Sequence, residues 1–160
     1  RLDTLRRSYA ALEAIEAADL ITMGPGSLYT SLIPNLLVRG IPQAIRQSRA
    51  VKVFVCNLMT QPGETRGYTA SAHLRAVADH VGEGLFDYVV LNTRELSRGL
   101  ARRYAAGRAG PVDNDLDAVR ALGVEPVLAS LLVEDRVARH DSGRLARLLL
   151  KLARRRPSPA

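Results

Sequence analysis

The stretch Asp19-Leu-Ile-Thr-Met-Gly-Pro-Gly-Ser-Leu-Tyr-Thr-Ser-Leu-Ile-Pro34 decides the fold class of this protein. Its apolar start predicts a short buried strand at 20–23. Its second half, with leucines at helical spacing, predicts a helix that begins after Ser27. A glycine-rich turn between a strand and a helix presents backbone N–H groups at a positive helix terminus, which suits a phosphate group.

The turn Gly24-Pro25-Gly26-Ser27 is therefore the first candidate ligand loop. We expect Ser27 to be the N-cap of the following helix, with the hydroxyls of Thr30 and Ser31 one turn later. The turn lacks the lysine of a P-loop, the third glycine of the dinucleotide-binding fingerprint and the spacing of a nucleophile elbow. The pattern alone leaves open a plain turn that needs two glycines for its backbone geometry.

Composition restricts the class of protein. The 160 residues are enough for one domain, and 47% of them are hydrophobic. The net charge of +7 comes from scattered arginines without interleaved aromatic residues, so we expect solvated surface and no nucleic-acid partner. No apolar run reaches about 18 residues, which predicts no insertion into a membrane. The single cysteine, Cys56, favours the cytoplasm and a buried packing role.

Two more apolar segments, 51–57 and 86–91, predict buried strands, and helical patterns separate them. This alternation predicts an α/β fold with a mainly parallel sheet. Polar segments follow three strands, at 24–31, 57–65 and 92–93. Ligands of such sheets lie beyond the carboxyl ends of the strands, so we expect these three segments to form one binding rim in which Ser27, Asn57 and Asn92 lie side by side.

The remaining sequence predicts the elements that cover this sheet. Helices are expected at 2–18, 69–80, 95–109, 115–122 and 142–152, with Thr69 as an N-cap. The apolar segment 124–133 is expected to be extended. We expect residues 1–156 to form a single domain and 157–160 to be a disordered tail. Because the chain starts at Arg1 and enters a helix directly, we interpret it as the C-terminal part of a longer protein.

A few polar residues suggest chemistry outside the turn. Arg139 can bind phosphate with its planar guanidinium group, and His140 can stack on a base or donate a hydrogen bond. Glu64 can accept hydrogen bonds from the hydroxyl groups of a ribose or sugar. Solvated side chains remain the alternative at all three positions. The spacing of His73 and His80 gives no metal site, so no metal or cofactor is predicted.

Two long motifs resemble a known family. Gly24-Pro-Gly-Ser-Leu-Tyr-Thr-Ser-Leu-Ile-Pro-Asn35 and Val55-Cys-Asn-Leu-Met-Thr-Gln-Pro-Gly-Glu-Thr65, together with Gly67-Tyr-Thr-Ala-Ser71 and Arg139-His140, are similar to the gluconeogenesis-factor (YvcK-like) proteins of bacteria. These are relatives of 2-phospho-L-lactate transferase in the CofD-like superfamily. The resemblance covers about Ala10 to Leu152.

The resemblance implies a Rossmann-like, three-layer α/β fold and a cytoplasmic regulatory protein that binds UDP-sugars such as UDP-N-acetylglucosamine. It also implies a role in cell shape and in the balance of cell-wall precursors on gluconeogenic carbon sources. Binding without turnover is the favoured function, and homo-oligomerisation stays open. The alternative is a transfer like that of 2-phospho-L-lactate transferase, from a nucleotide-activated donor to a deazaflavin.

The same resemblance implies positions for the ligand. One wall comprises Gly24, Pro25, Gly26, Ser27, Thr30 and Ser31. A second wall comprises Asn57, Thr60, Gln61, Glu64 and Thr65. Asn92 completes the rim, and Arg139 with His140 meets the uridine diphosphate part.

The sequence also departs from the family pattern. Family members open with a strand and a Gly-Gly-Gly-Thr-Gly loop, followed by an Asp-Asp-Gly-Gly segment, and both are absent from this sequence. We therefore expect the sheet to lack its N-terminal strands. Family members usually carry Asp at the position of Ala72, which cannot supply the reciprocal bond of a capping box.

Overall fold

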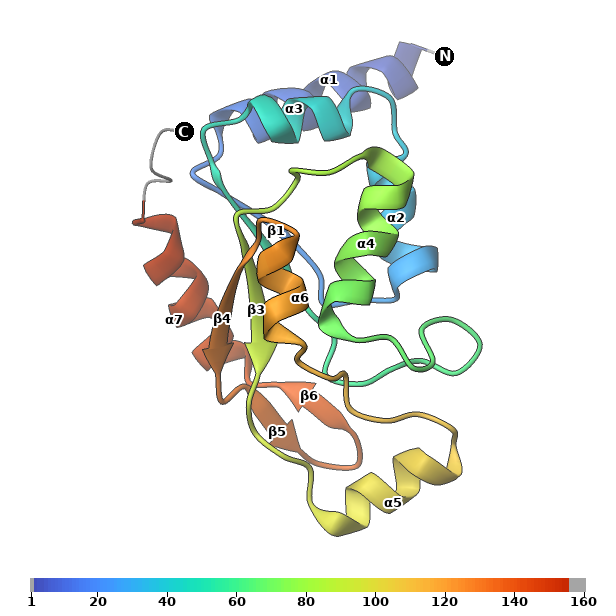
Figure 1. Ribbon diagram of the computed structural model, residues 1–160. Coiled ribbons are helices and arrows are strands. Elements are labelled where there is room, and N and C mark those ends of the chain that lie inside the picture. The colour runs from blue at the N-terminus through green and yellow to red at the C-terminus, as the bar shows by residue number, and fades with distance from the viewer. Residues whose placement is uncertain (1, 156–160) are drawn as a thin grey trace.

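Four short apolar segments form one parallel sheet in the computed structural model, which describes residues 2–155, with side chains from Tyr9 onward (Figure 1). The strands are β1 (Leu20–Met23), β2 (Val51–Val55), β3 (Tyr88–Asn92) and β4 (Glu125–Ala129), and they pair in the order in which they occur in the chain. All the connections between them contain helices, as parallel pairing requires. The predicted α/β fold with a parallel sheet is confirmed.

Successive side chains of β2 point to opposite faces of the sheet and pack in two separate hydrophobic cores. Val51, Val53 and Val55 pack in one cluster of buried residues, and Phe54 packs in the other. Because successive residues of a strand point to opposite faces, both faces of the sheet are buried. This explains why β2 is apolar at nearly every position and so clear in the sequence.

Helices cover both faces of the sheet and make three layers (Figure 1). The face of Phe54 is covered by segments of the chain that connect the strands, namely η1 (Leu28–Leu32), α2 (Ile33–Leu36), α3 (Ile41–Gln47), α4 (Ala70–Val81) and α6 (Leu116–Ala121). The face of Val53 is covered by α7 (Ser142–Ala153) through four leucines, Leu145, Leu148, Leu149 and Leu152. The N-terminal helix α1 (Leu2–Ala17) packs beside α3.

Several predicted boundaries are wrong. The helix after Ser27 is a π-helical turn (η1) followed by one α-helical turn (α2), because Leu32 donates its N–H to the Ser27 carbonyl and Pro34 has no N–H to donate. The strand expected at 86–91 begins at Tyr88. The helix expected at 95–109 is shorter, α5 (Arg98–Ala106).

The segment 124–133 is not one extended strand. It divides into β4 and β5 (Leu132–Glu134), which belong to different sheets. β5 pairs in antiparallel fashion with β6 (Ala138–His140). The expected disordered tail, 157–160, lies outside the described residues.

The hairpin β5–β6 and α5 lie together beyond the carboxyl ends of the strands (Figure 1). The Ala138 N–H donates to the Tyr104 hydroxyl at 2.9 Å, and a guanidinium N–H of Arg103 donates to the Arg136 carbonyl. The Ser97 N–H donates to Glu134 at 2.6 Å. These bonds fix α5 against the hairpin, so both can form walls of a site at this edge.

Within residues 2–155, no helix combines the length and apolar character needed to cross a lipid bilayer.

Candidate functional site

The ends of β1 and β2 are joined directly by Asn57 and Gly26. The Gly26 N–H donates to Asn57 Oδ1 at 3.0 Å, and Asn57 Nδ2 donates to the Gly26 carbonyl at 2.8 Å. A primary amide has both a donor and an acceptor, so one asparagine satisfies both backbone groups of the glycine. This pair of hydrogen bonds brings the first two polar segments, 24–31 and 57–65, together as expected.

The N-terminus of η1, where we expected a phosphate, holds a carboxylate of the protein itself. Ser27 is at the N-cap position, but its side chain makes no capping bond to the helix. The Ser27 hydroxyl donates to Glu64 at 2.6 Å, and the Tyr29 N–H donates to Glu64 at 3.2 Å. The expectation that Ser27 caps the helix with its own side chain is therefore wrong. Glu64 satisfies the free N–H and complements the helix dipole.

Thr30 and Ser31, whose hydroxyls were expected one turn later, lie on the exposed side of the turn. Thr30 is exposed, with its hydroxyl 2.6 Å from that of Ser27. Ser31 is also exposed, and its carbonyl accepts from Asn35 Nδ2. Neither residue lines one of the two clefts described below.

The second wall, 57–65, is mostly bonded to the protein. Thr60 is buried, and its backbone and hydroxyl both bond to Gly110. Thr65 is fully buried, and its hydroxyl accepts from the Gln61 N–H. The side-chain oxygen of Gln61 differs, because it is buried and has no hydrogen-bond partner among the described residues. Of this segment, Gln61 thus retains an unused acceptor.

Asn92 organises the turn between two sheets. Its Oδ1 accepts the N–H groups of Leu131 at 3.0 Å, of Leu132 at 3.1 Å and of Arg94 at 3.2 Å. These bonds stop β4 and start β5, which is why the apolar segment 124–133 divides. The side chain predicted to meet a ligand is engaged in holding the chain.

Arg139 and His140 lie on opposite sides of β6. Arg139 is exposed and lines neither cleft, whereas the half-buried His140 lines the first cleft. Neighbouring residues of a strand point in opposite directions, so one strand cannot bring both side chains to one ligand. Burial lowers the pKa of His140, and a backbone hydrogen bond with Cys56 offsets part of that effect.

The first cleft, here called the His140 cleft, has a volume of about 600 Å³. It lies where β1, β2, α5 and β6 meet and is lined by residues 25–27 and 57–62 together with Arg103, Tyr104, Gly107, Ala109, Ala138 and His140. Among the described residues that line it, none is an aspartate or a glutamate. Its ionisable groups are a guanidinium, a phenol and an imidazole, a set that favours an anion.

The second cleft, here called the Asn92 cleft, has a volume of about 480 Å³. It lies beyond the ends of β2 and β3 and is lined by residues 56–59, 91–96 and 111–114 together with Ala101 and Leu132. Its wall at 57–59 also belongs to the His140 cleft. The rim predicted from Ser27, Asn57 and Asn92 is thus one edge with two adjoining clefts, and Asn57 lines both.

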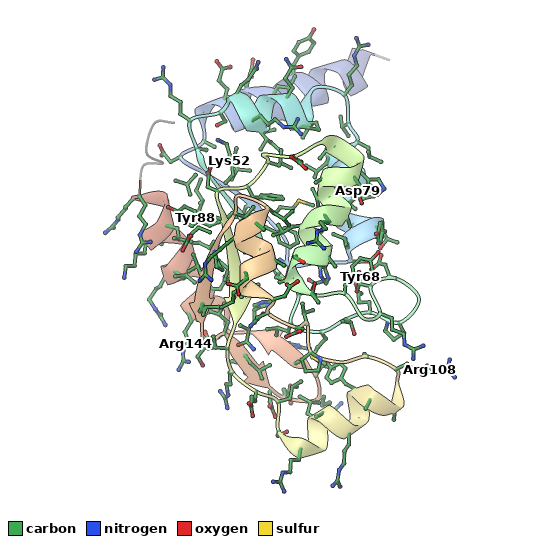
Figure 2. All side chains as sticks on the ribbon, viewed as in Figure 1. Lys52, Tyr68, Asp79, Tyr88, Arg108 and Arg144 are labelled. Atoms are coloured by element: carbon green, nitrogen blue, oxygen red, sulfur yellow. The ribbon has the colours of Figure 1, made fainter. Side chains whose placement is uncertain are left out.

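Sequence reasoning missed Arg103 and Tyr104, which line the His140 cleft from α5. The sequence pattern could have indicated Tyr104. It is the aromatic residue of a helix otherwise rich in arginine and alanine, and it stands four positions after the buried Leu100, on the same face of the helix. Figure 2 shows Arg108 just after this helix, pointing away from the sheet.

The segment that follows the second wall is tied to η1 and α4. The Tyr29 and Tyr68 hydroxyls are 2.8 Å apart, and this hydrogen bond, with burial, raises the pKa of Tyr29 to about 12. Tyr68 lies beside the start of α4 (Figure 2). The hydroxyl of Thr69 accepts from the Ala72 N–H at 3.2 Å, so the predicted N-cap is confirmed.

In the described part of the chain, no three His, Cys, Asp or Glu side chains are placed to hold a metal ion.

The chain matches known proteins along most of its length. Residues 3–132 match the family described as 2-phospho-L-lactate transferase CofD. The gluconeogenesis factor of Halalkalibacterium halodurans is 48% identical over 141 residues, which are 88% of this chain and 44% of that protein. The gluconeogenesis factor of Bacillus subtilis is 42% identical over 142 residues, which are 88% of this chain and 45% of that protein.

A solved structure agrees with the fold. The crystal structure of a UPF0052-family protein from Bacillus halodurans superposes with a TM-score of 0.86 at 48% identity and covers 88% of this chain and 46% of that chain. This chain therefore spans less than half the length of these relatives. The resemblance inferred from the two motifs is confirmed: the chain belongs to the 2-phospho-L-lactate transferase CofD family and is a partial match to longer gluconeogenesis factors.

Proposed function

We propose that this protein binds a UDP-sugar of the UDP-N-acetylglucosamine type in the cytoplasm and acts by binding rather than by turnover. In this proposal it is a gluconeogenesis factor that supports cell shape and the balance of cell-wall precursors on gluconeogenic carbon sources. The proposal includes no nucleic-acid partner and no insertion into a membrane. It is compatible with self-association of the protein.

One observation carries the proposal: the His140 cleft is a cavity of nucleotide size at the carboxyl edge of a parallel sheet and is lined by Arg103, Tyr104 and His140. The guanidinium group of Arg103 gives one N–H to Arg136 and retains other donors for a phosphate oxygen. The Tyr104 hydroxyl accepts from Ala138, which leaves its own proton free to donate.

The unused acceptor of Gln61 supports a base or ribose as the second part of the ligand. A buried oxygen without a hydrogen-bond partner costs about 1–3 kcal/mol, and a rotation of the Gln61 side chain toward a ligand N–H or O–H in the His140 cleft would remove that cost. A diphosphate alone has no such donor when it is fully ionised. The combination of an arginine with a free acceptor therefore favours a nucleoside diphosphate over a simple anion.

Binding without turnover is supported by the His140 cleft, where no described lining residue is acidic, and by two nearby carboxylates that the fold already engages. Glu64, the carboxylate nearest the glycine-rich turn, is engaged with Ser27 and Tyr29. Asp115 accepts hydrogen bonds from the Ser71 backbone and hydroxyl. Burial raises the pKa of Asp115, but the hydrogen bonds together outweigh burial and hold the pKa below its usual value. The acceptor capacity of these two carboxylates is thus used by the fold, so neither is free to take a proton from a ligand.

A second candidate function is the transfer that the family description names. The observation that favours it is the presence of two adjoining clefts, because a transferase must hold a donor and an acceptor together. Formation of a phospholactyl product from a nucleotide-activated donor and a deazaflavin acceptor would support this function over the first.

Isothermal titration calorimetry on the full-length protein tests the proposal. We expect UDP-N-acetylglucosamine to bind, and the variant Arg103→Gln to bind it about tenfold more weakly, a loss of about 1.4 kcal/mol. The matched control is Arg147→Gln on α7, an exposed arginine outside both clefts, which should leave the affinity unchanged. Absence of binding at millimolar ligand contradicts the proposal.

A further inference from the structure

The two clefts differ in charge, although they share a wall. Arg103 and His140 line the His140 cleft, where no described lining residue is acidic. Glu95 and Asp113 line the Asn92 cleft together with Arg94. One guanidinium N–H of Arg94 donates to the Leu132 carbonyl at 3.2 Å, so part of this group is already used by the fold.

The Asn92 cleft is rich in acceptors that the fold leaves unused. Asp113 bonds to α4 through its backbone carbonyl, and its carboxylate has no hydrogen bond or ion pair to another described residue. The side-chain nitrogen of Asn114 donates to the Asn92 carbonyl, which leaves the side-chain oxygen of Asn114 available. Thr93 adds an exposed hydroxyl at the same edge.

This set of groups selects against phosphate and in favour of hydroxyl groups. Two carboxylates repel an anion, whereas carboxylate and amide oxygens accept hydrogen bonds from several hydroxyls at once. The apolar side chains of Leu58, Met59 and Leu96 on the same cleft suit the C–H face of a sugar ring.

We infer that the Asn92 cleft is the subsite for the uncharged, hydroxyl-bearing group of a nucleotide-linked ligand, whose diphosphate lies in the His140 cleft. This inference rests on the proposed function and specifies it further. The segment 57–59 lines both clefts, so a ligand that crosses it contacts both without leaving the protein surface. Asp113 and Glu95 then determine which sugar is accepted.

The test compares two ligands on the full-length protein by calorimetry: UDP and UDP-N-acetylglucosamine. The variant Asp113→Ala should lower the affinity for UDP-N-acetylglucosamine at least fivefold more than the affinity for UDP. Arg103→Gln should lower both affinities by the same factor. The matched control is Asp117→Ala, which removes an exposed aspartate of α6 outside both clefts and should change neither affinity.

The outcomes separate the two ideas. If neither ligand binds, the proposed function fails. If both bind and Asp113→Ala lowers the two affinities equally or not at all, the proposed function stands and the sugar subsite is overturned. Thermal unfolding of each variant checks its fold. If Asp113→Ala does not fold, Glu95→Gln replaces it, because Glu95 is exposed and lines the same cleft. Glu95→Gln must then lower the affinity for UDP-N-acetylglucosamine at least fivefold more than the affinity for UDP.

Discussion

The carboxylate of Glu64 lies 2.6 Å from the hydroxyl oxygen of Ser27, a residue 37 positions earlier in the chain. It also accepts the Tyr29 N–H, so the protein places its own anion at the helix end that follows the glycine-rich turn. A ligand phosphate at this position would have to displace Glu64. The nearby His140 cleft offers an arginine without that competition.

Replacement of Glu64 by alanine should destabilise the protein. The variant Glu64→Ala leaves the Tyr29 N–H and the Ser27 hydroxyl without their acceptor, and we expect a loss of about 1–3 kcal/mol in the free energy of unfolding. Chemical denaturation measures it. Glu13→Ala, at an exposed position of α1, is the control and should change stability by less than about 0.5 kcal/mol. Equal stability of the two variants would show that the carboxylate does not cap η1.

Asn92 should tolerate aspartate far better than alanine. Asn92→Ala removes the acceptor of three backbone N–H groups, and we expect a loss of about 2–4 kcal/mol, summed over groups left unsatisfied. Asn92→Asp keeps the acceptor and loses one donor bond to the exposed Arg94 carbonyl, so it should cost less than half as much. Thermal unfolding compares the two variants. If they are equally unstable, the acceptor role is wrong.

Gly24 should be far less replaceable than Gly63. Both have φ in the left-handed region, at 86° and 78°, where an alanine costs about 1–2 kcal/mol. A Cβ at Gly24 would also lie 2.6 Å from the Val55 carbonyl oxygen, whereas nothing lies within 4 Å of a Cβ at Gly63. We expect Gly24→Ala to lower the melting temperature several degrees more than Gly63→Ala. Similar melting temperatures would contradict the close approach of β1 and β2 at this point.

His73 should make the protein less stable in acid. It is fully buried, with Nδ1 2.8 Å from the Thr69 carbonyl, and burial lowers its pKa. The unfolded chain therefore binds the proton more tightly, so the free energy of unfolding falls as the pH drops below about 6.5, by up to about 1.4 kcal/mol per pH unit. His140 acts in the same direction.

The control for this pH dependence is the variant His73→Gln. Denaturation between pH 7 and 5 should show a smaller slope of stability against pH for His73→Gln than for the unmodified protein, whatever the variant costs at neutral pH. The same slope in both proteins would show that His73 takes up its proton equally well when folded and unfolded.

Local sequence was sufficient for several elements, although not for the start of β3 or for the division of 124–133 into β4 and β5. The apolar segment of β2, the glycine-rich turn after β1 and the Thr69 cap of α4 each follow from the chemistry of a few neighbouring residues, and all three are confirmed. The order of strands and helices then required parallel pairing, which brings the polar ends of β1, β2 and β3 to one edge.

The partners of the polar side chains at that edge were decided by the tertiary structure. Glu64 meets Ser27, Asn57 meets Gly26 and Asn92 meets Leu131 across more than 30 positions of sequence, and no local pattern encodes such a meeting. Buried polar groups must be satisfied, so most of the predicted ligand residues bind the protein itself. The side chains that remain available to a ligand in the His140 cleft are therefore mainly those of Arg103 and Tyr104 on α5. These residues reach the edge of the sheet because the hairpin β5–β6 holds α5 there.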